Sequence, residues 1–137
     1  MNTEQKKSHR HRRVFSGSAN EIAQSYARAV VTGTEVRLSG TTGFDYINDT
    51  LFEGAGAQAE QIFRNAGNAL AQVGGSLADI VRVRIYIARA EDYDAVMDAF
   101  ATAFRGIDPA CTTVQAGLFD PDIRVEMDMD AVIDGLA

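Results

Sequence analysis

The sequence predicts an α+β domain in which strands and helices follow one another in the order β-β-α-β-α-β-β. Two observations support this prediction: short segments in which apolar and polar residues alternate, and two longer segments with an apolar residue at every third or fourth position. Because each segment has one apolar side, both helices are expected to cover the same face of a single mixed sheet. A chain of 137 residues suits one domain with a core large enough to fold unaided.

Five segments have the alternation expected of half-buried strands. The clearest runs from Ile80 to Ile87, with the valines and isoleucines from Val81 onward on one face and Arg82, Arg84 and Tyr86 on the other. A loop from Gly40 to Gly43 is expected to end the second strand. The five strands are expected over residues 25–31, 35–39, 80–87, 110–117 and 124–133.

Two segments have the apolar stripe of an amphipathic helix. The first covers about residues 53–73 and is expected to stop at Gly74-Gly75. The second covers about residues 92–105 and is expected to stop at Gly106, because glycine accepts the left-handed conformation that closes a helix.

The last strand, after a turn at Asp120-Pro121-Asp122, is acidic on one face. Carboxylates that share a strand face repel one another unless a basic group faces them. This face is either exposed to solvent or a subunit interface in which Arg82 and Arg84 pair with the carboxylates, and the single helical layer favours an oligomer. The acidic face carries Arg124, Glu126, Asp128 and Asp130, and the apolar face Val125, Met127, Met129 and Ala131.

Charge is distributed unevenly along the chain. The first 13 residues hold five of the 13 basic residues and one of the 19 acidic residues, so the rest has eight basic and 18 acidic residues, a net charge of −10. Residues 1–13 are therefore expected to form a basic disordered tail and residues 14–137 a single domain. An acidic domain is a poor binder of nucleic acid, because the phosphate backbone favours a basic surface.

The histidine and cysteine content excludes several classes of site. Both histidines, His9 and His11, lie in the tail, so the domain has none to act as a general base or metal ligand. This argues against Ser-His and Cys-His hydrolases and most zinc sites, and no metal is expected. The single cysteine, Cys111, cannot form an internal disulfide, and no apolar segment is long enough to span a membrane, so a cytoplasmic location is expected.

Several short motifs occur in a family-specific order. They are SYARAV, the Ser39-Gly40 strand end, QVGGSLADIVRVRIYI, PACTTV and VEMDMDAVI. Together they resemble the Rid family (YjgF, reactive-intermediate deaminase, also called L-PSP endoribonuclease) over about residues 25–133. This resemblance implies a chorismate-mutase-like fold and a homotrimer with a cleft between each pair of subunits. It also implies hydrolysis of enamines and imines, such as 2-aminoacrylate and its imine, to a carbonyl compound and ammonia without a cofactor.

The resemblance also implies roles for individual residues. Glu126 matches the carboxylate that positions or activates the attacking water. A carboxylate with a raised pKa suits this role, because an imine carbon is already electrophilic and needs only an oriented water and a modest proton acceptor. The substrate-binding positions would be Tyr26, Ser39, Gly40, Cys111 and Thr113.

Two positions depart from the deaminating members of the family. Cys111 stands where those members have an arginine that binds the substrate carboxylate, and Met97 stands where they have an asparagine. Cysteine cannot form the bidentate, charge-assisted contact that arginine makes. The chain thus resembles a subgroup lacking this arginine, and its substrate is expected to differ from 2-aminoacrylate-type imino acids. A neutral or larger imine fits better, unless Arg82 or Arg84 supplies the missing charge.

Three functions remain open from the sequence. The first is an imine or enamine hydrolase of altered specificity, the second a non-catalytic trimeric protein that binds a small molecule or regulates, and the third an endoribonuclease. Glu126 has a simpler interpretation as a strand residue paired with Arg82 or Arg84. Cys111 is either a reactive thiol or a small apolar filler.

Overall fold

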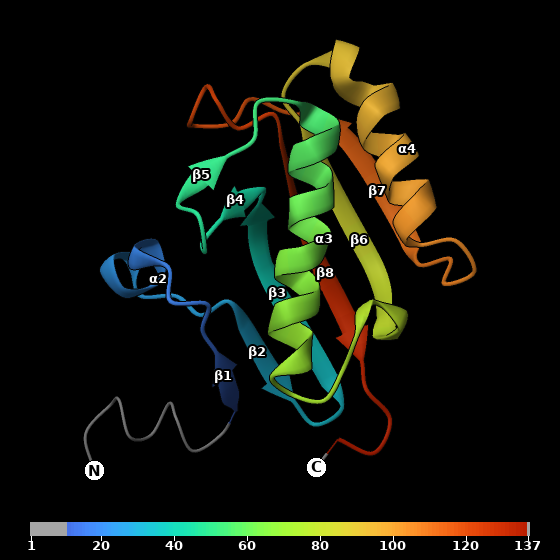
Figure 1. The fold of residues 1–137 in the computed structure, drawn as a ribbon. Helices are drawn as coiled ribbons and strands as arrows, with labels where there is room; N and C mark the ends of the chain where they lie inside the picture. The colour runs from blue at the N-terminus through green and yellow to red at the C-terminus, as the bar shows by residue number, and fades with distance from the viewer. Residues whose placement is uncertain (1–10, 137) are drawn as a thin grey trace.

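The computed structural model describes residues 11–136, which form a six-stranded sheet with two long helices against one face (Figure 1). The sheet order is β1-β2-β3-β8-β6-β7. Its strands are β1 (Arg12–Val14), β2 (Ala29–Thr32), β3 (Glu35–Thr42), β6 (Ile80–Ile87), β7 (Ala110–Gln115) and β8 (Val125–Val132). A small hairpin of β4 (Phe44–Asp45) and β5 (Thr50–Leu51) lies beside it, and the helices are α2 (Ala19–Gln24), α3 (Ala55–Ala71) and α4 (Tyr93–Ala103).

The last strand lies in the middle of the sheet. β8 is antiparallel to β3 on one side and to β6 on the other, whereas β7 is parallel to β6 and forms the far edge. β7 and β8 follow each other in the sequence but are therefore separated by β6. The mixed sheet and the helices on one face agree with the prediction.

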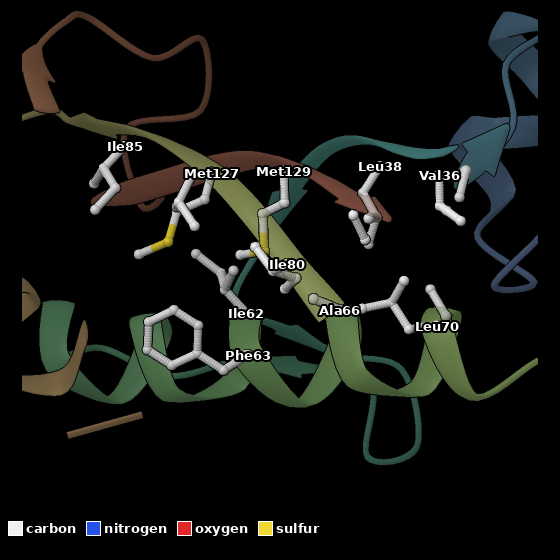
Figure 2. Packing of buried hydrophobic residues seen from close by; sticks show 14 of the residues in the cluster. Val36, Leu38, Ile62, Phe63, Ala66, Leu70, Ile80, Ile85, Met127 and Met129 are labelled. Carbon is white, nitrogen blue, oxygen red and sulfur yellow. The ribbon is translucent and has the colours of Figure 1, made fainter. Parts of the chain in front are cut away.

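The hydrophobic core lies between the sheet and α3. Along β8 the apolar residues are buried and the acidic ones half-buried, so the predicted two faces of this strand are confirmed. Met127 and Met129 point from the sheet toward Ile62 of the helix (Figure 2), and all three are at most 1% exposed. Burial of each such side chain contributes roughly 1.5–3 kcal/mol to folding. No helix of the described residues is long and apolar enough to cross a membrane.

β3 does not end where the sequence predicts. It continues through Gly40 to Thr42, and its register to β8 shifts between Leu38 and Thr41. Ser39 and Gly40 therefore share the position opposite Asp128, which is the arrangement of a β-bulge. The predicted loop from Gly40 to Gly43 is wrong because the extra residue of the bulge interrupts the alternation.

Three further features of the strands differ from the prediction. The strand expected at residues 25–31 begins only at Ala29, because Ser25 closes α2 with a left-handed φ of 64°. In β6 a second bulge leaves Val81 48% exposed and Ile80 buried in its place. Arg12 and Arg13 pair with β2 inside the segment expected to be a tail, and residues 1–10 lie outside the described residues.

Candidate functional site

Glu126 is a carboxylate on the open face of the sheet, the face without helices. It lies on β8 between Thr42 of β3 and Tyr86 of β6, and its side chain is half-buried. Burial raises the pKa of Glu126 above the usual value of 4.5; the charge of Arg28 lowers it and that of Asp128 raises it again. Among the described residues no group donates a hydrogen bond to this carboxylate or forms an ion pair with it. Such a group can accept a proton.

The two other carboxylates of β8 are occupied. Arg84 Nη1 lies 2.7 Å from Asp128 Oδ1 and 3.4 Å from Asp130 Oδ2. The Tyr86 hydroxyl donates to Asp128 Oδ2 at 2.7 Å, and this hydrogen bond raises the pKa of Tyr86. Arg84 is therefore the basic partner expected for the acidic face, but it pairs with Asp128 and Asp130. The interpretation of Glu126 as a residue paired with Arg82 or Arg84 is wrong.

Gly40 forms the wall against which Glu126 rests. A Cβ atom at Gly40 would lie 2.8 Å from Oε2 of Glu126, which is closer than two such atoms approach in folded proteins. The bulge brings the backbone this near to the carboxylate. Its other residue, Ser39, donates its hydroxyl to the carbonyl of Ala27 at 2.7 Å and so joins β3 to the segment before β2.

Arg28 joins these residues from behind. Its side chain is buried, and Nη1 donates to the Gly40 carbonyl at 2.8 Å and to Thr41 Oγ1 at 3.0 Å. Its Nε donates to Glu21 Oε2 at 3.1 Å, and its guanidinium carbon lies 5.6 Å from the centre of the Tyr26 ring. We call this set the Glu126 group, which consists of Tyr26, Arg28, Ser39, Gly40 and Glu126.

Cys111 and Thr113 lie elsewhere. They are the register neighbours of Val83 and Ile85, two buried residues, so they belong to the helix-covered face of the sheet. Thr113 Oγ1 lies 3.7 Å from Cys111 Sγ and donates to Met97 Sδ of α4, also at 3.7 Å. These three residues are called the Cys111 group. Within one chain, the six predicted site residues therefore form two groups on opposite faces.

No arginine of β6 reaches the Cys111 group within one chain. Arg82 and Arg84 are the register neighbours of Ala110 and Thr112, which alternate with Cys111 and face the opposite side. A hollow of about 470 Å³ beside Thr113 is lined by Tyr93, by Glu91 and Asp94, and by no basic residue. A carboxylate-bearing ligand would meet no positive charge in this hollow.

His11 is remote from both groups. Its Nδ1 lies 3.3 Å from Thr32 Oγ1, and Thr32 pairs with Glu35 at the end of β3 opposite to Thr42 and Glu126. His9 lies outside the described residues. The residues that the structure describes also contain no group of three side chains able to hold a metal ion.

Comparison with known proteins identifies the family. The sequence model of the family described as endoribonuclease L-PSP matches residues 17–133, most of the chain. The chain belongs to the L-PSP family, also known as YjgF or RidA. An uncharacterized protein of Streptomyces coelicolor is 36% identical to this family member over 124 residues, which cover 88% of this chain and 90% of the relative.

Solved structures of YjgF and RidA proteins share the fold of this L-PSP family protein. Rv2704 of Mycobacterium tuberculosis, a member of the YjgF/YER057c/UK114 family, has a TM-score of 0.81 at 35% identity, covering 90% of this chain and 99% of that one. RidA of the Antarctic bacterium Psychrobacter sp. PAMC 21119 has a TM-score of 0.75 at 32% identity, covering 80% and 89%. The predicted α+β, chorismate-mutase-like fold is thus confirmed.

Arg28 of this L-PSP family protein is a member of the Glu126 group that was not predicted from the sequence. The structure places Tyr26, Ser39, Gly40 and Glu126 together, and Arg28 contacts two of them. The only signal for it was one charged residue within an otherwise apolar segment, SYARAVV. Arg28 is held in its buried position by Glu21 and by the bulge in β3. No short sequence motif joins Arg28 to either of them.

Proposed function

We propose that this protein hydrolyses a reactive enamine or imine to a carbonyl compound and ammonia. The observation that supports it is Glu126, the half-buried carboxylate with a raised pKa that no described residue pairs with. As water adds to the imine carbon, Glu126 accepts a proton from that water. The nitrogen gains both protons of that water, one returned by Glu126 and the other from the new hydroxyl group, and leaves as ammonia while the carbon–oxygen double bond forms.

The proposed site is completed by a second copy of the chain. The Glu126 group and the Cys111 group lie on opposite faces of one sheet, so one chain alone cannot offer both to one substrate. A homotrimer, with the open face of one subunit against the edge strand of the next, would bring the two groups together. A reducing cytoplasm, in which the exposed Cys111 stays a free thiol, is the proposed compartment.

The proposed substrate is an imine without a carboxylate beside the reacting carbon. Cys111 carries no charge, and the hollow next to Thr113 is lined by Glu91 and Asp94. A carboxylate there would lose its hydration without gaining a charge-assisted hydrogen bond, which contributes roughly 1.5–3 kcal/mol.

Ammonia release tests this function directly. A set of imines generated in situ, with and without an α-carboxylate, would be mixed with the wild-type protein and with Glu126→Gln. We expect faster release from the uncharged imines and loss of that rate in the variant. Asp130→Asn is the matched control, because Asp130 lies on the same strand face but pairs with Arg84. Equal rates for wild type and Glu126→Gln would refute the proposal.

A non-catalytic small-molecule-binding protein is the second candidate, and the uncharged Cys111 group favours it. Binding without turnover would raise the melting temperature with increasing ligand and release no ammonia. RNA cleavage, which the family's description names, is opposed by the net charge of −10 beyond the first 13 residues. RNA cleavage therefore ranks below the other two functions, and cleavage of RNA by a preparation free of contaminating RNase would overturn this order.

A further inference from the structure

We propose that Arg28 is the positioning residue of the Glu126 group: its buried guanidinium holds the Gly40 backbone against the Glu126 carboxylate and supplies positive charge to it. This inference rests on the proposed function of Glu126. Arg28 does not touch Glu126; it acts through Gly40 and through the field of its charge.

Gly40 connects the two side chains. On one side its carbonyl accepts a hydrogen bond from Arg28 Nη1 at 2.8 Å, and on the other its α-carbon leaves space only for the Glu126 carboxylate. The same guanidinium nitrogen donates to Thr41 Oγ1 at 3.0 Å, so it holds Gly40 of the bulge and the residue that follows it. A displacement of Arg28 would therefore move the backbone against which Glu126 rests.

Glu21 fixes the position of Arg28. The Glu21 carboxylate is buried, binds Arg28 Nε at 3.1 Å and accepts hydrogen bonds from the amide and the hydroxyl of Ser16. Charges buried to this extent need a partner, and removal of one partner of a buried pair is strongly destabilising.

The groups around Glu126 come from four places, and two of these groups, Asp128 and Arg28, carry a charge that acts on it. β6 presents Tyr86, β8 presents Asp128, and β3 presents only the uncharged Gly40 and Thr42. Arg28 lies behind β3. Burial and Asp128 favour the protonated form of Glu126, and Arg28 is the cation that opposes them. Its charge thus favours the ionised form that accepts a proton.

The experiment follows the titration of Glu126 itself. Side-chain carboxyl signals of protein labelled with ¹³C-glutamate would be recorded against pH by NMR, with the Glu126 signal assigned from its loss in Glu126→Gln. We expect the titration midpoint of Glu126 to rise in Arg28→Gln and to stay close to wild type in Arg28→Lys, which keeps the charge. Arg37→Gln removes an exposed arginine of β3 and is the matched control, with no expected shift.

A folded Arg28→Gln protein with an unchanged Glu126 midpoint would overturn the proposal and leave Arg28 a structural anchor. If Arg28→Gln does not fold, the double variant Glu21→Gln/Arg28→Gln decides, because removal of both charges leaves neither buried without its partner. A higher Glu126 midpoint in this variant supports the proposal, whereas an unchanged one overturns it. Because this readout needs no substrate, it is independent of the proposed reaction. On an imine that proves to be a substrate, Arg28→Lys should lower kcat about ten- to a hundredfold with little change in KM.

Discussion

The carboxylate of Glu126 lies against the α-carbon of Gly40, with Oε2 only 2.8 Å from the place where a Cβ atom would be. This contact arises because β3 has one extra residue opposite Asp128, so Gly40 bulges toward β8. A carboxylate confined by backbone on one side and by no described hydrogen-bond donor on the other can turn toward a water or a substrate.

Gly40→Ala should impair the site and preserve the fold. The added methyl group meets the end of a flexible side chain, so Glu126 can rotate away at small cost to stability. We expect an unchanged melting temperature within a few degrees and a loss of imine hydrolysis of about tenfold or more. Gly54→Ala, where a Cβ atom would meet nothing within 4 Å, is the control. Full activity in Gly40→Ala would contradict the role of this contact.

Gly43→Ala should instead destabilise the fold. A Cβ atom there would lie 2.5 Å from the backbone carbonyl oxygen of Gln58 in α3, and backbone cannot rotate away. We expect destabilisation of about 3 kcal/mol or more, measured by urea unfolding. Gly67→Ala lies inside α3 with free space around it and should stabilise the protein by about 0.5–1 kcal/mol.

Glu126→Gln should stabilise the protein near pH 7. Because the pKa of Glu126 is raised in the folded state, folding favours the protonated form. The protonated Glu126 side chain therefore contributes to the free energy of unfolding. This contribution is fully present below the pKa of the unfolded state and is lost as the pH rises through the pKa of the folded state. The neutral glutamine should therefore raise the melting temperature at pH 7, and the gain should shrink toward pH 4. Glu60→Gln, on the exposed side of α3, is the control. A gain that grows toward acid pH would contradict the sign of this shift.

Arg84→Gln should destabilise the sheet more than Arg37→Gln does. Arg84 lies between Asp128 and Asp130, so its loss leaves two like charges on one strand face. Among the described residues Arg37 pairs only with Glu35, and both side chains are more than half exposed, so its loss should change little. Thermal unfolding at low and high salt checks the comparison, since added salt should narrow the difference. Equal melting temperatures of Arg84→Gln and Arg37→Gln at low salt would show that Arg84 does not stabilise the acidic face of the sheet.

Cys111→Arg should extend the proposed activity to α-imino acids. Cys111 is exposed on an edge strand, so an arginine side chain fits without disturbing the core. A bidentate contact with the substrate carboxylate should raise kcat/KM about ten- to a hundredfold for α-imino acids and leave neutral imines unchanged. Cys111→Ser is the control, and ammonia release is the measurement. No gain in the arginine variant would exclude this position from the substrate site.

The segments that the sequence predicted correctly are those governed by local pattern. β6 begins and ends where its alternation does, and α3 stops just before Gly74, which has the positive φ of 80° expected of a glycine beyond a helix end. These features depend on neighbouring residues, so periodicity and glycine placement reveal them. The same holds for the two faces of β8, including the position of Glu126 on the acidic one.

Other features depend on contacts between distant residues, and only the tertiary structure decided them. The partner of Arg84 follows from the register between β6 and β8, and the approach of Gly40 to Glu126 follows from a bulge that no local pattern marks. The parallel pairing of β7 with β6 sets Cys111 on the opposite face from Glu126. The sequence by itself thus determined the five main strands, the two long helices, the family resemblance and the candidate carboxylate. Folding decided which charges are neutralised and that Arg28 lies buried behind Gly40, because register and burial are properties of the assembled sheet.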